Sequence, residues 1–152
     1  TSLSWKGFDL SAIFAYSIGG YIYNRDITMI LHNGSLEGRD WSTEILKRWT
    51  PENRYTDVPA LSTTSNNWNS ASTRFLQNNS YMRLKNLTLS YDLPKQWISK
   101  LALSSVQVFV QGDNLFTIHR NQGLDPEQGI TGITYYRYPA MRTISGGINL
   151  SF

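Results

Sequence analysis

The chain has 152 residues, which is enough for one ordinary domain. It contains no Cys, which excludes disulfides and thiolate metal sites, and its net charge of +3 is too small and scattered to indicate a nucleic-acid partner. No apolar run approaches the roughly 18 residues that a membrane helix needs, so helical spans are excluded as well. The first residues, TSLSWKGFDL, contain no initiator Met or signal peptide and read like the end of a strand. We therefore expect the chain to be a piece of a longer protein.

Residues 8–22 follow the two-residue period of a β-strand, after a turn at Lys6–Gly7 that ends a fragmentary first strand. A strand from Leu10 to Ile22 would measure roughly 40 Å at ~3.3 Å per residue. Tilted by about 45°, it would still cross a hydrocarbon core of about 30 Å. Strands of soluble domains usually have about five or six residues, so this length favours a membrane protein. The predicted apolar face contains Phe8, Leu10, Ala12, Phe14, Tyr16, Ile18 and Ile22.

Residues 24–79 form a very long connection with two recognisable parts. The segment DWSTEILKRWTP predicts a short helix, with Asp40 as its N-cap and with Trp41, Ile45 and Trp49 spaced four residues apart. The polar segment TTSNNWNSAST predicts a loop that is mobile or faces a ligand.

Two further strands are predicted after this connection. In SYMRLKNLTLSYDLP, apolar and polar residues alternate, and Pro94 ends the strand because it has no N–H to donate. In SSVQVFVQGDNLFTIH the alternation is less regular, because Phe109 and Leu115 lie on the polar side. Between these two strands, QWISKLAL predicts a short helical turn.

The chain ends in TISGGINLSF, where apolar residues occupy the even positions and small or polar residues the odd ones. The charged residue nearest the end is Arg142, so neither face of this last strand carries a charge. Gly146 and Gly147 leave the sheet thin here, which allows close approach of another backbone or a bend. The apolar face can be turned inward, as in a soluble sandwich, or outward to lipid, as in a transmembrane barrel.

The distribution of charge favours the barrel. None of the 14 Lys and Arg or the 11 Asp and Glu residues lies in 10–24, 86–91, 101–112 or 143–152. The polar faces of the predicted strands instead carry Ser, Thr, Asn, Gln and Gly, where a soluble sheet would commonly carry Lys and Glu. This composition is typical of a barrel interior.

The connections alternate in length, and this predicts an orientation. Outer-membrane barrels have short periplasmic turns and long external loops. We therefore expect residues 24–79 and 121–139 outside, Lys6–Gly7 and 94–104 at the periplasm, and the C-terminus at the periplasmic face.

The sequence contains no motif for catalysis, and we expect no enzyme activity and no cofactor or metal site. His32 and His119 have no second ligand at metal spacing, and Asp125 and Glu127 are better explained by a solvated Asp-Pro turn than by a calcium loop. The candidate ligand-facing aromatic residues are Trp41, Trp49 and Trp68, although packing of the loop explains the first two more economically.

Six segments in order resemble the C-terminal end of TonB-dependent transporters of the SusC/RagA type, which are outer-membrane proteins of Bacteroidetes. They are LSWKGFDLSAIFAYSIGGYIYN, RWTPEN, SYMRLKNLTLSYDLP, VFVQGDNLFTI, GLDPE and YPAMRTISGGINLSF. The resemblance covers nearly the whole chain. It rests on segments of barrel wall and turn, so no ligand residue is carried over from the family.

The resemblance implies an all-β fold, an antiparallel up-and-down meander that supplies the last five or so strands of a transmembrane barrel of about 22 strands. Residues 1–152 would be the C-terminal part of this barrel, without its plug. The family imports glycan or peptide fragments in a TonB-dependent manner. The implied partners are a SusD-like lipoprotein, the TonB complex through the missing N-terminal part, outer-membrane lipid and the barrel-assembly machinery. The signal that this machinery reads would consist of Ile148, Leu150 and Phe152.

Two alternatives remain open from the sequence. A soluble carbohydrate-binding β-sandwich would use the aromatic residues as a sugar platform and would stay monomeric without detergent. A passive porin-type barrel would lack a plug and a TonB-interacting segment before residue 1.

Overall fold

The computed structural model describes residues 1–32, 36, 38–62, 64, 70–99, 103–121, 123, 125–127, 131–134 and 137–152. The chain divides into two compact units. The sheet unit consists of Thr1–Gly19, Asn79–Asn121 and Pro139–Phe152, and the loop unit consists of Gly20–Asn78 and Gln122–Tyr138. No helix within the described ranges is both long and apolar enough to span a membrane.

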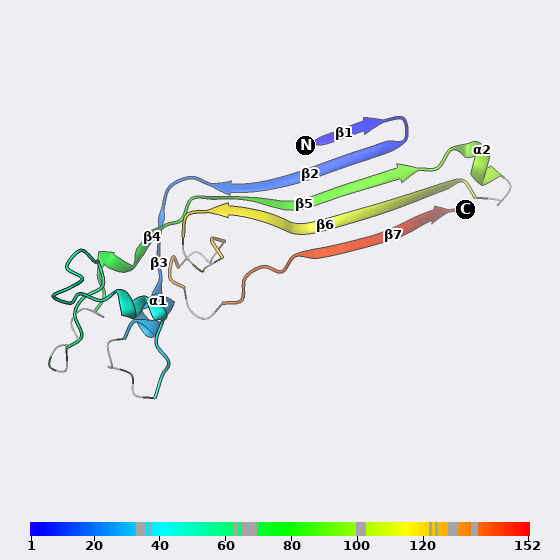
Figure 1. Cartoon of the computed structure of the whole chain (residues 1–152). Helices are drawn as coiled ribbons and strands as arrows, with labels where there is room; N and C mark the ends of the chain where they lie inside the picture. Colours follow the sequence, from blue (N-terminus) through cyan, green and yellow to red (C-terminus); the bar gives the residue numbers. More distant parts are fainter. Residues whose placement is uncertain are drawn as a thin grey trace. The chain divides into compact units, whose positions relative to one another are not determined.

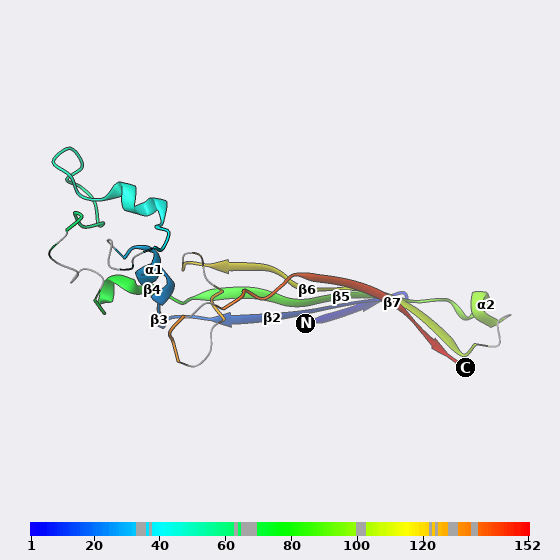
Figure 2. The same cartoon turned by 90° about the horizontal axis from the view of Figure 1, so that it is seen from below.

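The sheet unit is one antiparallel sheet in the order β1-β2-β5-β6-β7 (Figure 1). The same strands seen from below form a single layer (Figure 2). Each strand pairs with the strand of this sheet that precedes it in the chain, so the predicted up-and-down meander is confirmed. The strands are β1 (Ser2–Trp5), β2 (Phe8–Ser17), β5 (Tyr81–Asp92), β6 (Ser105–His119) and β7 (Thr143–Ser151).

The two short connections of the sheet unit follow the sequence closely. Lys6 and Gly7 have φ angles of 47° and 87°, as a two-residue type I′ hairpin turn requires. Pro94 ends β5 and serves as the N-cap of α2 (Lys95–Ile98), which is the expected helical turn. Residues 100–102, in the rest of that predicted turn, lie outside the described residues.

The second strand is shorter than the sequence analysis predicts. The alternating pattern continues to Ile22, but β2 ends at Ser17. Gly19 and Gly20 follow with φ angles of 85° and 79°, a left-handed conformation that interrupts an extended strand. Ile22 belongs instead to β3 (Tyr21–Tyr23) in the loop unit.

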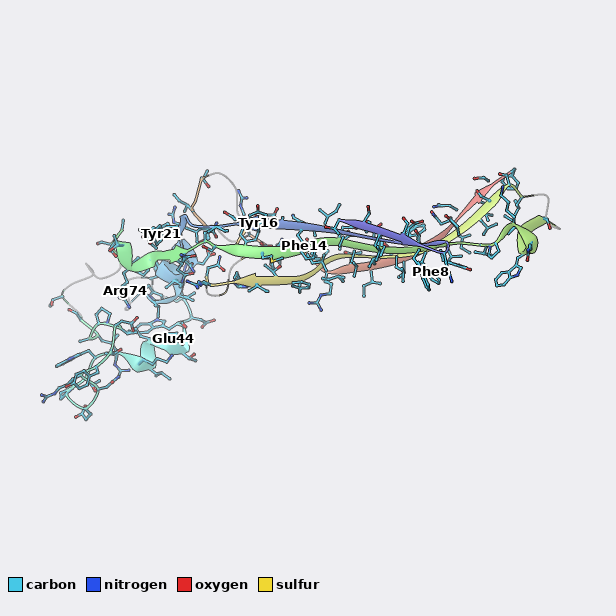
Figure 3. The ribbon with its side chains drawn as sticks, turned by 90° about the horizontal axis from the view of Figure 1, so that it is seen from above. Phe8, Phe14, Tyr16, Tyr21, Glu44 and Arg74 are labelled. Carbon is cyan, nitrogen blue, oxygen red and sulfur yellow. The ribbon has the colours of Figure 1, made fainter. Side chains whose placement is uncertain are left out.

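The sheet has one apolar face, and most of its large side chains are exposed, with Leu84 and Val106 as buried exceptions. Residues opposite each other on paired strands share a face, so the register places Phe8, Tyr91, Val108 and Ile148 in one row. Val110 and Ile148 remain 49% and 63% exposed, which is far from the burial of a protein core. Phe8, Phe14 and Tyr16 lie along β2 in Figure 3.

A bulge at Lys85 shifts the apolar face of β5 from even to odd residue numbers. Asn86 pairs with Ile13 and Leu84 pairs with Phe14, so Lys85 has no partner on β2. Leu87 and Leu89 therefore share the apolar face with Leu84 and Met82. At the same point on β6, two residues, Asn114 and Leu115, have no pairing partner on β5. Because two residues are skipped, the apolar face of β6 keeps even numbers along the whole strand.

The two apolar residues that break the pattern of β6 are explained by glycine. A Cβ atom on Gly147 would come within 2.8 Å of Phe109 Cζ, because the Phe109 ring lies over that glycine. A Cβ atom on Gly112 would likewise come within 2.7 Å of Leu115 Cδ2. Each glycine thus provides the space for one apolar side chain from β6.

The loop unit has a small sheet, short helices and a buried apolar cluster. The cluster contains Leu31, Ile45 and Val58, and Ile22 and Phe75 elsewhere in this unit are almost completely buried. The elements are β3, which pairs with β4 (Leu76–Asn78), α1 (Arg25–Ile30), and the 3-10 helices η1 (Thr43–Lys47) and η3 (Thr73–Phe75).

The helix predicted near Asp40 is present in a different form. It is the 3-10 helix η1, and its N-cap is Ser42, whose Oγ accepts a hydrogen bond from the Glu44 N–H at 3.3 Å. The sequence analysis assigned the cap to Asp40 because it begins the pattern, but the serine directly before the helix is the residue that reaches this N–H. Glu44 lies on η1 in Figure 3 and forms an ion pair with Lys47.

The packing of Phe109 on Gly147 predicts a coupled mutational effect. Gly147→Ala should lower the free energy of unfolding by about 1–3 kcal/mol, because the new methyl group displaces the ring. The same substitution made in a Phe109→Ala background should cost far less, since no ring opposes the methyl group. Urea unfolding of the four proteins of this double-mutant cycle measures the coupling. Equal costs in both backgrounds would show that the ring does not limit residue 147.

Candidate functional site

The polar face of the sheet unit carries a connected group of hydrogen-bonding side chains centred on Asp113. The Asp113 carboxylate accepts hydrogen bonds from Asn86 Nδ2 at 2.7 Å and from Gln111 Nε2 at 3.2 and 3.3 Å. Asn86 Oδ1 in turn accepts from Thr88 Oγ1 at 2.9 Å. These side chains come from β5 and β6, directly beside the bulge at Lys85. They join β5 to β6 at the point where the register shifts.

The same face contains a buried cation one row further along. Arg83 is only 3% exposed, and its Nε donates a hydrogen bond to Thr117 Oγ1 at 2.9 Å. Thr117 is its cross-strand partner on β6. Strands β2, β5, β6 and β7 contain few charged residues, and Arg83, Lys85 and Asp113 all lie close to the bulge. A surface of this kind suits contact with water, a polar ligand or another polar segment.

Aromatic residues mark the end of the sheet unit near the Lys6–Gly7 turn. Trp5, Phe8 and Tyr91 are consecutive cross-strand partners on β1, β2 and β5. The rings of Phe8 and Tyr91 are 4.4 Å apart between centroids, and Lys6 Nζ lies 5.1 Å from the Trp5 ring. Aromatic side chains with a nearby cation are typical of the boundary between apolar lipid and water.

The structure places the candidate tryptophans at separate points. Trp41 contacts His32 edge to face, with ring centroids 5.1 Å apart, and remains partly exposed. Trp49 is also partly exposed, and its backbone N–H donates to Val58 O at 2.8 Å. Trp68 lies outside the described residues. Their predicted role in ligand binding stays a prediction.

The remaining polar candidates have local structural partners. Asp125 Oδ1 accepts a hydrogen bond from the Glu127 N–H at 2.9 Å, as expected for an Asp-Pro turn. His119 Nδ1 is 2.9 Å from the Asn121 carbonyl oxygen, and His32 Nδ1 accepts from the Leu36 N–H at 3.2 Å. Within the described part of the chain, no three His, Asp or Glu side chains gather in a way that could hold a metal ion.

The group around Asp113 is absent from the sequence-based candidates. The alternation places Asp113 on the polar side of its strand, but its neighbours Asn86 and Thr88 belong to another strand. Which residues meet depends on the register across β5 and β6, and the bulge sets that register. The only sign of this group in the sequence is that positions 86, 88, 111 and 113 are polar.

No protein-family model matches the chain, but individual proteins do. It is 32% identical to TonB-dependent receptor P3 of Formosa agariphila, over 99% of this chain and 15% of that protein. It is 28% identical to TonB-dependent receptor SusC of Bacteroides thetaiotaomicron, over 100% of this chain and 14% of that protein. The chain therefore spans about a seventh of the length of these relatives.

Solved structures give the same result. The chain matches the structure of the RagAB peptide importer in the 'closed-closed' state with a TM-score of 0.85 and 35% sequence identity. The match covers 98% of this chain and 16% of that chain. The 'open-open' state matches with the same values. The resemblance to TonB-dependent receptors of the SusC/RagA type and the all-β fold class are thereby confirmed.

The hydrogen bonds to Asp113 predict that this carboxylate stabilises the sheet. Asp113→Ala should lower the free energy of unfolding by about 1–3 kcal/mol, because the amides of Asn86 and Gln111 lose their shared acceptor. Asp92→Ala is the matched control, since Asp92 is an exposed acid at the end of β5. Urea unfolding compares the two variants, and equal small effects would show that the group around Asp113 contributes no stability.

Proposed function

We propose that this chain is the C-terminal part of an outer-membrane β-barrel that imports nutrients in a TonB-dependent manner. In this proposal residues 1–152 provide the last five strands of a barrel of about 22 strands. The observation that carries it is a single-layered sheet whose apolar face is exposed while its other face is polar and hydrogen-bonded. The similarity to named receptors and to a peptide importer supports the same conclusion.

The dimensions of the strands support a membrane location. β2 has 10 residues, so at about 3.3 Å per residue and a tilt of about 45° it rises about 23 Å. The apolar band of an outer-membrane barrel is about 25 Å tall. The row of Trp5, Phe8 and Tyr91 would then lie at one boundary of the bilayer.

A soluble carbohydrate-binding sandwich fits these observations poorly. A sandwich covers the apolar face of each sheet with a second sheet, whereas Val110 and Ile148 are largely exposed. The protein would act in transport rather than as an enzyme. The competing transport function is a passive porin, which would need no proton-motive force for uptake.

Orientation and partners follow from the same proposal. The Lys6–Gly7 turn, α2 and the C-terminus would lie at the periplasm, and the loop unit would lie outside the cell. Outside, a SusD-like lipoprotein would assist capture of glycan or peptide fragments, with Trp41, Trp49 and Trp68 as candidate contacts. The TonB complex would act through the part of the protein that precedes this chain. Ile148, Leu150 and Phe152 would be read by the barrel-assembly machinery.

Uptake by intact bacteria tests the function. Cells that lack the full-length protein should take up labelled oligopeptides or labelled oligosaccharides more slowly than the parent strain. Uptake by the parent should also stop when a protonophore collapses the proton-motive force, because TonB-dependent import needs energy. Protein-dependent uptake that continues with the protonophore would identify a passive porin. Equal uptake of both probe classes in the two strains would contradict a role in importing either one.

Two neighbouring residues on β7 predict which face meets lipid. Ile148 is on the apolar face, and Asn149 is on the other face, where its Nδ2 donates to Gln107 Oε1 at 3.2 Å. Ile148→Arg should cost about 2–4 kcal/mol in folding into lipid vesicles if the residue lies near the midplane. Asn149→Arg should cost much less, because the proposed lumen is polar. A larger cost at Asn149 would mean that the apolar face points inward.

A further inference from the structure

The two long connections of the chain meet at Tyr23. The Tyr23 N–H donates to Gly132 O at 2.8 Å, and Tyr23 O accepts from the Thr134 N–H at 3.1 Å. Tyr23 and Ile133 form a parallel β-bridge between these two bonds. The segment 131–134 therefore lies beside β3, although more than a hundred residues of chain separate them. Gly132 has a φ angle of 63°, so the turn that presents this segment uses a left-handed glycine.

Thr134 also completes the start of a helix in the other connection. Its Oγ1 accepts a hydrogen bond from the Arg25 N–H, the first N–H of α1, at 3.1 Å. Thr134 is 1% exposed, so water does not compete for this position. Helix N–H groups in the first turn have no partner within the helix, and here one of them depends on a residue from a distant segment.

Asn24 joins a third segment to the same point. Its N–H donates to Phe75 O at 2.8 Å, and its Nδ2 lies 3.4 Å from Gln77 Oε1, which accepts the bond. Asn24 Oδ1 accepts from the Ile27 N–H at 3.0 Å and so caps α1. Asn24 is 1% exposed. The start of α1 is thus held by buried polar groups from residues 24, 75, 77 and 134.

Such an arrangement couples the opening of one connection to the other. Pulling the segment 131–134 away would leave the N–H groups of Tyr23 and Arg25 without their acceptors in a poorly hydrated site. Releasing β3 would in turn leave the Thr134 N–H without an acceptor. Opening either segment alone therefore costs the free energy of these broken hydrogen bonds, so we expect the two segments to open together.

We infer that segments 20–30, 73–78 and 131–134 form one cooperative conformational unit, in which hydrogen bonds of Asn24 and Thr134 join the two connections. Contact of a ligand or a partner with either connection is then transmitted to the other through the start of α1. This inference concerns the loop unit alone and does not depend on what the protein transports.

Native-state hydrogen exchange of the unmodified full-length protein tests this inference directly. Exchange is measured at increasing urea concentrations below global unfolding, on peptides that include residues 20–30 or residues 131–134. Both sets of peptides should exchange through one opening, with the same free energy and the same dependence on urea. Different urea dependences would show that the two connections open independently and would overturn the inference.

A substitution in one connection should also be felt in the other. Thr134→Val keeps the shape of the side chain but removes the acceptor for the Arg25 N–H, and it should speed exchange about tenfold in peptides covering residues 20–30. Thr131→Val is the matched control, because Thr131 lies in the same segment but is exposed. An effect of Thr134→Val that is confined to its own segment, or that Thr131→Val reproduces, would contradict the inferred coupling.

Discussion

The two-residue period of an extended chain, kept in register across five strands, is the constraint on which the sheet unit depends. It gives a single layer one mainly apolar face and one mainly polar face, with Ile13 and Phe109 as apolar exceptions in polar rows. An extra residue in one strand would normally exchange the two faces. At Lys85 the exchange occurs, and the sequence already compensates for it, since the apolar residues of β5 change from even to odd numbers at that point. The bulge and the sequence pattern therefore belong together.

The strands themselves could be predicted, because alternation is a local signal. β1, β5, β6 and β7 lie where the pattern indicates, and α2 follows Pro94 as expected. The bulge could not be predicted, since the pairing of Asn86 with Ile13 and Asp113 is a property of three strands together. The exceptions at Phe109 and Leu115 had the same origin. Phe109 depends on Gly147 of the neighbouring strand, and Leu115 depends on Gly112, three residues earlier. The alternation of apolar and polar residues signals neither contact.

The loop unit illustrates the opposite case. β3, β4 and α1 have short, irregular sequences, and none of them was predicted apart from the apolar residue Ile22. Their positions depend on buried polar contacts such as those of Asn24, which join residues that lie about 50 positions apart. Propensity and periodicity describe neighbours along the chain, so they carry no information about such contacts. The N-cap is a smaller example, because the sequence analysis named Asp40 and the structure uses Ser42, two residues later.

These differences have an energetic consequence. The loop unit buries an apolar cluster of Leu31, Ile45 and Val58, and Ile22 and Phe75 are also almost fully covered. The sheet unit leaves its large apolar side chains exposed, and burial of each would contribute about 1.5–3 kcal/mol. In water that contribution is absent, and backbone hydrogen bonds, each with a net contribution of about 0.5–1.5 kcal/mol, hold the layer together. Apolar surroundings would supply this burial on one face, while water would hydrate the side chains around Asp113 on the other. The two faces of the sheet therefore match a boundary between lipid and a polar interior.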